Sequence, residues 1–64
     1  MDFNYRVKAI GYTTDQLLAM GFGVNTYECQ PGEHWAIACS GSAMDRLIKR
    51  HKLNIVGQPE AIRG

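Results

Sequence analysis

Cysteine is scarce in this chain, and its scarcity excludes a disulfide-based scaffold. The two cysteines, Cys29 and Cys39, are too few for such a framework. Long apolar runs are absent as well, since none approaches the ~18 residues that a membrane-spanning helix needs. The first six residues lack a basic stretch followed by an apolar core, so we expect no secretory signal. These absences predict a cytosolic protein, unless the chain is the mature form of a secreted one.

A large net charge is also missing. The formal charge is +1 at pH 7, which argues against bulk electrostatic attraction to nucleic acids or membranes. The composition, with 45% hydrophobic and 20% charged residues, is typical of a soluble globular chain. A chain of this size buries only about 60% of the surface that its unfolded form exposes. We therefore expect one small domain over residues 1–64 with a thin core, in which residues 57–64 form a loose tail.

Sequence motifs for chemistry are absent too. Gly21 and Gly23 flank Phe22 but precede a strand, so no helix N-terminus follows them to hold a phosphate. Cys29 and His34 could meet at a turn, yet structural zinc normally takes four ligands. A Cys–His nucleophile pair needs a third, orienting group and a shielded cleft, which a solvent-facing turn does not provide. We therefore predict that the protein is not an enzyme and has no catalytic, cofactor-binding or metal-binding residues.

What the sequence does contain is a β-hairpin over residues 23–40. Pro31 and Gly32 suit its turn, because proline fixes φ at the first corner and glycine tolerates a positive φ at the second. The flanking residues alternate between large apolar and small or polar side chains, as in half-buried strands. We expect the large set to face the core: Tyr27, Cys29, Trp35, Ile37 and Cys39. We expect the other set to face solvent: Thr26, Glu28, His34, Ala36 and Ala38.

Residues 3–10 also alternate, which predicts a strand with two different faces. Val7 and Ala9 lie on its apolar face, and Arg6 and Lys8 lie on its basic face. A weaker strand is expected over residues 53–56, followed by a turn over residues 57–60.

Two helices are predicted between these strands. Thr13 and Gln16 fit a capping box at the start of the first helix, and Gly21 fits a left-handed cap at its end. The second helix is expected to begin near Gly41, with Ser42 as N-cap. The order β-α-β-β-α-β then predicts an α+β fold, a two-layer ferredoxin-like sandwich in which an antiparallel sheet carries both helices on one face. In that arrangement the first and third strands are central.

Two known families share parts of this pattern. Small β-α-β-β-α-β domains include copper-chaperone-like metal carriers, which place a Cys-x-x-Cys pair in the loop after the first strand. Here that loop, residues 11–14, contains no thiol. Separately, residues 17–22 (Leu-Leu-Ala-Met-Gly-Phe) resemble the helix end and Met-Gly-Phe loop of ubiquitin-associated domains, which implies a three-helix fold and ubiquitin binding. That family has a second helix soon after the loop, whereas the pattern here predicts a strand, so the three-helix fold does not fit.

Two classes of function remain. The first is a small non-catalytic protein-interaction module, an inhibitor or modulator of a larger protein machine; small phage and mobile-element proteins are analogous in size and fold. Its partner would bind the open face, meaning the sheet face without helices, through these residues: Arg6, Lys8, Glu28, His34, Ala36 and Ala38. A second copy of the chain could pair through this face or through an edge strand at residues 24–28. The second class is a nucleic-acid-binding accessory protein that uses the basic face of the second helix: Arg46, Lys49, Arg50 and Lys52.

Aromatic side chains are not expected on the open face. A sheet that binds RNA needs stacking aromatics there, so RNA binding through the sheet is not expected. The predicted orientation of the hairpin places Trp35 in the core. In that case, replacing Trp35 by alanine should lower the free energy of unfolding by about 3–5 kcal/mol.

Overall fold

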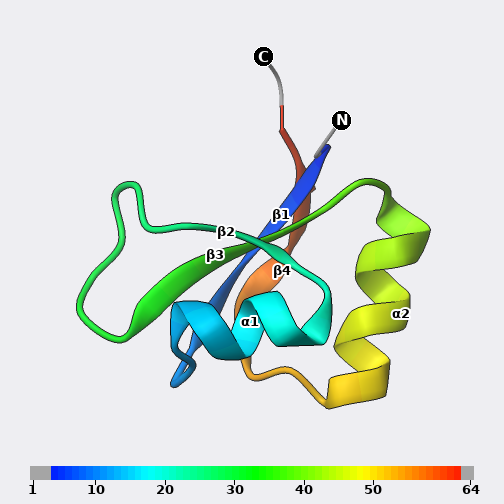
Figure 1. The fold of residues 1–64 in the computed structure, drawn as a ribbon. Helices are drawn as coiled ribbons and strands as arrows, with labels where there is room; N and C mark the ends of the chain where they lie inside the picture. Colours follow the sequence, from blue (N-terminus) through cyan, green and yellow to red (C-terminus); the bar gives the residue numbers. More distant parts are fainter. Residues whose placement is uncertain (1–3, 63–64) are drawn as a thin grey trace.

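Four strands and two helices alternate along the chain in a computed structural model of the protein, which describes residues 4–62. The strands are β1 (Tyr5–Ile10), β2 (Gly23–Asn25), β3 (Glu33–Ala38) and β4 (Ile55–Ala61). The helices are α1 (Thr14–Met20) and α2 (Gly41–His51). The result is a small α+β domain whose element order agrees with the sequence pattern (Figure 1).

The sheet is antiparallel, with the strand order β2-β3-β1-β4. The central strands β1 and β3 pair along their whole length, with Lys8 opposite Trp35 and Val7 opposite Ala36. Strands β2 and β4 form the edges. The prediction that the first and third strands are central is therefore confirmed. The predicted start of the first strand at Phe3 lies outside the described residues.

Both helix starts are defined by side-chain caps. Thr13 and Gln16 form the predicted capping box of α1: the Thr13 hydroxyl accepts from the Gln16 N–H at 3.1 Å, and the Gln16 side chain accepts from the Thr13 N–H at 2.8 Å. The predicted cap of α2 was wrong by two residues. Ser40, whose backbone is extended, accepts from the Ala43 N–H at 3.1 Å and so begins the helix before Ser42. Neither helix is long and apolar enough to span a membrane.

One core joins both helices to the same face of the sheet. Leu17 of α1 and Met44 of α2 are fully buried in it. The sheet contributes mostly small side chains to this core: Val7, Ala9, Ala36 and Ala38. Phe22 and Leu53 complete the buried set. Leu18, which follows Leu17 on α1, is exposed.

The predicted orientation of β3 was wrong. Ala36 and Ala38 are 0% and 4% exposed and face the helices, whereas Trp35 and Ile37 lie on the opposite side of the strand. The pairing explains why: Ala36 is opposite the buried Val7, and residues opposite each other in an antiparallel pair share a face. Alanine is among the residue types most often fully buried, and it leaves room for Leu17 and Met44 above the sheet.

The hairpin before β3 is looser than the sequence suggested. β2 ends at Asn25, whose side-chain oxygen accepts from the Tyr27 N–H at 2.8 Å and turns the chain out of the strand. Residues 26–32 then form a loop that projects from the sheet (Figure 1). The predicted turn is present at its end, where Gly32 has φ 85° and the Glu33 N–H donates to the Gln30 carbonyl at 3.0 Å. Residues 26–29, which were expected to alternate as part of a strand, therefore lie in this loop.

Strand β4 is longer than predicted. The expected turn over residues 57–60 is instead an irregularity within β4. The strand pairs with β1 again at Glu60, which lies opposite Arg6. Gly57 supplies the positive φ (73°) that the irregularity requires. Pro59 is tolerated because β4 is an edge strand, where an outward-facing N–H has no partner strand. Residues 57–61 are therefore part of the sheet and not a loose tail.

The packing of the alanine-lined face predicts sensitivity to added volume. Ala36→Leu should lower the free energy of unfolding by about 1–3 kcal/mol, because the added methyl groups displace Leu17 or Met44. Ala19→Leu adds the same volume at an exposed site on α1 and should change stability by less than about 0.5 kcal/mol. Urea unfolding of both variants measures the difference. Equal stability of the two would contradict this assignment of the core.

Candidate functional site

Trp35, the single tryptophan of the chain, lies at the centre of the open face. It is half-buried and sits on a central strand, opposite Lys8 on β1. Val56 of β4 is also opposite Lys8 and lies on the same face. Neither α1 nor α2 packs on this side, since both contribute to the core on the other face. The largest aromatic side chain of the protein is therefore part of its surface.

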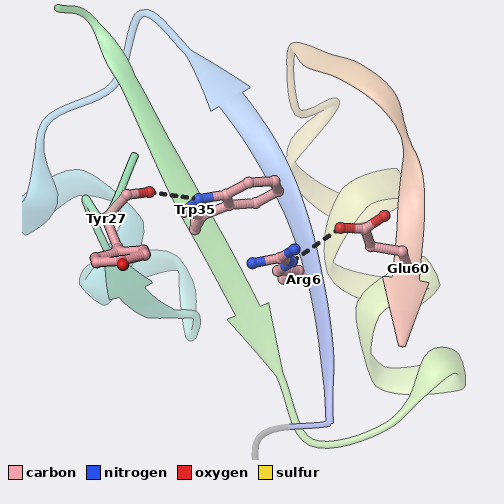
Figure 2. Close-up of polar contacts among 4 residues, drawn as sticks. All are labelled: Arg6, Tyr27, Trp35 and Glu60. Carbon is pink, nitrogen blue, oxygen red and sulfur yellow. Dashed lines mark hydrogen bonds and ion pairs between the residues drawn. The ribbon is translucent and has the colours of Figure 1, made fainter. Parts of the chain in front are cut away.

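Two cations hold the Trp35 ring. The Arg6 guanidinium carbon lies 4.2 Å from the ring centroid, and the Lys8 Nζ lies 4.9 Å from it. Figure 2 shows the ring lying across β3 and β1 with Arg6 beside it. Each contact contributes about 0.5–1 kcal/mol at an exposed site. The aliphatic parts of the Arg6 and Lys8 side chains also cover apolar surface while their charged ends remain in water.

A hydrogen bond fixes the orientation of the same ring. The Trp35 Nε1–H donates to the carbonyl oxygen of Tyr27 at 2.8 Å (Figure 2). This bond ties the loop over residues 26–32 to the sheet. The Tyr27 side chain is 68% exposed, so the loop places a second aromatic residue beside the open face.

The charges on the open face compensate one another. Arg6 Nε contacts Glu60 Oε1 at 2.9 Å, and Lys8 Nζ contacts Glu33 Oε1 at 3.6 Å. Pairs as exposed as Arg6–Glu60 contribute at most about 1 kcal/mol to stability. Their main consequence is electrostatic: the face holds two cations and two carboxylates and has no net charge.

Of the residues expected to bind a partner, the structure brings only Arg6 and Lys8 together on the open face. Ala36 and Ala38 are core residues and cannot contact a partner. His34 shares the orientation of Ala36, because it lies opposite Ala9 on the helix-covered side. Glu28 lies in the loop after β2, in a left-handed conformation with φ 57°. The predicted site is thus partly wrong, for the same reason that the orientation of β3 was wrong.

Sequence reasoning missed Trp35 as a surface residue, although a signal for it existed. The positions of Arg6 and Lys8 on the outward side of a central strand were predicted correctly. Two cations on the same face of a central strand are stabilised by cross-strand neighbours that attract positive charge. An aromatic ring attracts it through a cation–π contact. Trp35 was the one residue of β3 that could provide it.

Cys29 and Cys39 are free thiols, half-buried and exposed respectively. The buried Nδ1 of His34 has no hydrogen-bond partner within the described part of the chain. Over residues 4–62, no group of three or more metal-ligating side chains comes together and no pocket is found.

The second predicted site lies on α2 and just after it. Its four basic residues are all exposed: Arg46, Lys49, Arg50 and Lys52. None of them forms an ion pair with another residue between positions 4 and 62, where the ion pairs are those of Arg6 and Lys8. Their placement agrees with the sequence pattern, and their charge is not neutralised by carboxylates of the described chain.

No protein-family model, curated protein or solved structure matches this chain. The segment that resembles ubiquitin-associated domains, residues 17–22, ends α1 and is followed by β2 and not by a helix. The case for function therefore depends on the geometry of the open face and of α2.

The Trp35 hydrogen bond predicts a local effect on the loop. Trp35→Phe keeps an aromatic ring beside Arg6 and Lys8 but removes the N–H donor, which should lower stability by about 0.5–1.5 kcal/mol. Amide hydrogen exchange over residues 26–32 should accelerate more than exchange in the helices. Tyr27→Phe is the control, because Tyr27 accepts through its backbone oxygen and should behave like the wild type. Unchanged loop exchange in Trp35→Phe would contradict the anchoring role of the indole.

Proposed function

We propose that this protein is a small non-catalytic interaction module that binds a protein partner through the open face of its sheet. The observation that carries this proposal is the position of Trp35, on a face that neither helix covers and in contact with Arg6 and Lys8. Such a module acts by occupying part of a partner's surface, which is how an inhibitor or modulator of a larger protein works.

The composition of this face supports a protein partner. Trp, Tyr and Arg are the residue types most enriched among those that dominate binding energy in protein interfaces, and the face combines Trp35, Arg6 and, at its margin, Tyr27. The Trp35 ring is held by two cations and one hydrogen bond before any partner arrives. Less side-chain freedom is therefore lost on binding, which favours affinity.

Charge distinguishes a protein partner from RNA on this face. RNA binding through the sheet was not expected because no aromatic side chain was predicted on the open face. Trp35 does lie there, and an exposed tryptophan on a sheet could stack on a base. However, Arg6 and Lys8 are already paired with Glu60 and Glu33. A phosphate backbone would have to compete with these carboxylates, whereas an uncharged protein surface would not.

The fold and setting belong to the same proposal. We place the strand order β2-β3-β1-β4, with its two helices, in the ferredoxin-like class. A cytosolic setting suits the two free thiols, because cysteines stay reduced there.

A second candidate function is nucleic-acid binding through α2. The observation that favours it is the group of exposed basic residues at 46, 49, 50 and 52, none of which is paired within residues 4–62. Free cations on one helix can contact successive phosphates and release their counterions.

The proposed interface can be tested with two matched charge insertions. Val56 is 50% exposed on the open face, and Leu18 is 53% exposed on α1. In affinity capture from the native cell, Val56→Glu should lose the bound partner because it places a carboxylate in the apolar part of the interface. Leu18→Glu should retain the partner. Loss with Leu18→Glu and retention with Val56→Glu would instead place the interface on the helices and reject the open face.

The second candidate predicts a mobility shift that depends on α2. Arg46→Glu combined with Arg50→Glu should abolish binding of single- or double-stranded oligonucleotides at low salt, because phosphate contacts are lost and like charges repel. Arg6→Glu combined with Lys8→Glu changes the net charge equally on the other surface and should leave the shift in place. If the wild type produces no shift at low salt, nucleic-acid binding is rejected.

A further inference from the structure

The cations of the chain are concentrated in one part of the molecule. α2 and the residue that follows it carry one carboxylate, Asp45, and four cations: Arg46, Lys49, Arg50 and Lys52. The remainder of residues 4–62 carries two cations and four carboxylates. With histidine neutral, the first group has a formal net charge of +3 and the second has −2. The low net charge of the chain therefore results from two opposite charges that are separated in space.

The acidic part lies away from α2. Glu28 belongs to the loop over residues 26–32, and Asp15 lies in the first turn of α1. Figure 1 shows this loop and the start of α1 on one side of the molecule and α2 on the other. Neither carboxylate forms an ion pair with a residue between positions 4 and 62. A molecule with this charge distribution turns α2 toward a polyanion as it approaches.

We propose that α2 binds double-stranded nucleic acid along its phosphate backbone, without reading the base sequence. This inference rests on the second candidate function and names its ligand. Arg46 and Arg50 are one helical turn apart, which is about 6 Å along the axis, and Lys49 lies on the same exposed side. Phosphates follow one another every ~3.4 Å along each strand of a duplex, so cations at this spacing can contact neighbouring phosphates.

The helix dipole does not account for all of these cations. Basic residues in the last turn stabilise the negative end of a helix, and Lys49 and Arg50 lie there. Arg46 lies before the last turn. Lys52 ends α2 in a left-handed conformation with φ 50°, at a position that most often holds glycine. A lysine at that position adds a cation at some cost in backbone strain, and such strain is concentrated at functional sites.

The composition of α2 favours a duplex over a single strand. Proteins that bind single strands combine cations with aromatic side chains on which the bases stack. Residues 41–52 contain no Phe, Trp or Tyr. A duplex carries one charge per ~1.7 Å of its axis, about twice the density of one strand. Binding that depends on charge alone is therefore stronger for the duplex.

The side chains of α2 are suited to phosphates and not to bases. Recognition helices read bases mainly with residues at their N-terminal end, where α2 exposes Ser42 and Asp45. Residues 41–52 also contain no Asn or Gln, the side chains that pair with adenine. Contacts to phosphates carry no sequence information. A duplex held in this way leaves Trp35 uncovered, because α2 packs on the other face of the sheet.

The test measures how the protein binds labelled nucleic acids of different form. Fluorescence anisotropy at low salt compares two DNA duplexes of unrelated sequence, an RNA duplex and one of the DNA single strands. The three duplexes should bind with affinities within about threefold of one another, because the phosphates are what they share. The single strand should bind at least about fivefold more weakly, because its charge density is lower and its bases find no aromatic side chain. A plot of the logarithm of the duplex association constant against that of the salt concentration should have a slope of about −2.7 to −3.6, for three or four phosphate contacts.

A matched pair of charge removals identifies the surface. Asp45→Asn removes the carboxylate of α2 and should tighten duplex binding by about twofold or more, because that carboxylate repels phosphates. Asp15→Asn makes the same change in net charge on α1 and should alter the affinity little, because salt screens Asp15 from a ligand on α2. A gain in affinity cannot arise from a loss of folded protein.

Three results would reject the inference. If no duplex binds at low salt, nucleic-acid binding through α2 is rejected with it, and the proposed role of the open face is unaffected. Suppose instead that binding is lost with Arg46→Glu and Arg50→Glu, but the single strand binds as tightly as a duplex or one duplex is preferred by about tenfold. The second candidate function then holds, and a duplex bound by its backbone is rejected. Equal gains with Asp45→Asn and Asp15→Asn would show that net charge determines binding and that α2 does not.

Discussion

The structure depends on the close approach of the helix layer to three alanines of the central strands. Ala9, Ala36 and Ala38 are almost completely buried, and Leu17 and Met44 of the two helices fill the space above the sheet. Interiors are packed too densely to accept extra volume without strain. Because side chains alternate along a strand, burying Ala36 and Ala38 places Trp35 and Ile37 on the other face. The composition of the core thus determines the composition of the surface opposite it.

An exposed tryptophan on a central strand would belong to a large exposed apolar patch, which is unfavourable in water, if its neighbours were apolar too. Here the long side chains of Arg6 and Lys8 contact the ring and keep their charges in water. Glu60 and Glu33 neutralise those charges in turn. The open face is therefore stable in the isolated chain, yet it has an apolar centre and no net charge. Those two properties together favour a protein surface as its partner.

Local signals in the sequence predicted much of this fold. The capping box of Thr13 and Gln16, the left-handed Gly21 and the Pro31–Gly32 turn depend on near neighbours in the chain, and all are present. The orientation of β3 depends on something that no local pattern contains, namely how closely two helices approach the sheet. The size of an apolar side chain indicates how favourable its burial is. It does not indicate whether the space between the sheet and the helices can hold it. Preferring the large side chains of β3 for the core therefore gave the wrong face.

That single error also displaced the candidate site. Arg6 and Lys8 were placed correctly because the alternation of β1 separates charged from apolar residues. β3 has no such contrast, since Trp35, Ala36, Ile37 and Ala38 are all apolar. Residues 26–29 lie in the loop over residues 26–32 and not in a strand, so their alternation did not indicate which side of β3 faces the core. The register with β1 was needed to show that Lys8 and Trp35 share a face.

The size of the chain links the open face to stability. A domain of this size has a thin core and a free energy of unfolding of only about 5 kcal/mol or less, and here the core includes neither Trp35 nor Ile37. Each ~100 Å² of apolar surface that a partner covers contributes about 2.5 kcal/mol of hydrophobic free energy before the costs of association. A partner that binds only the folded chain adds its binding free energy to the stability of the fold. With the partner proposed above, the position of Trp35 outside the core would couple folding to association, and the bound chain would be more stable than the free one.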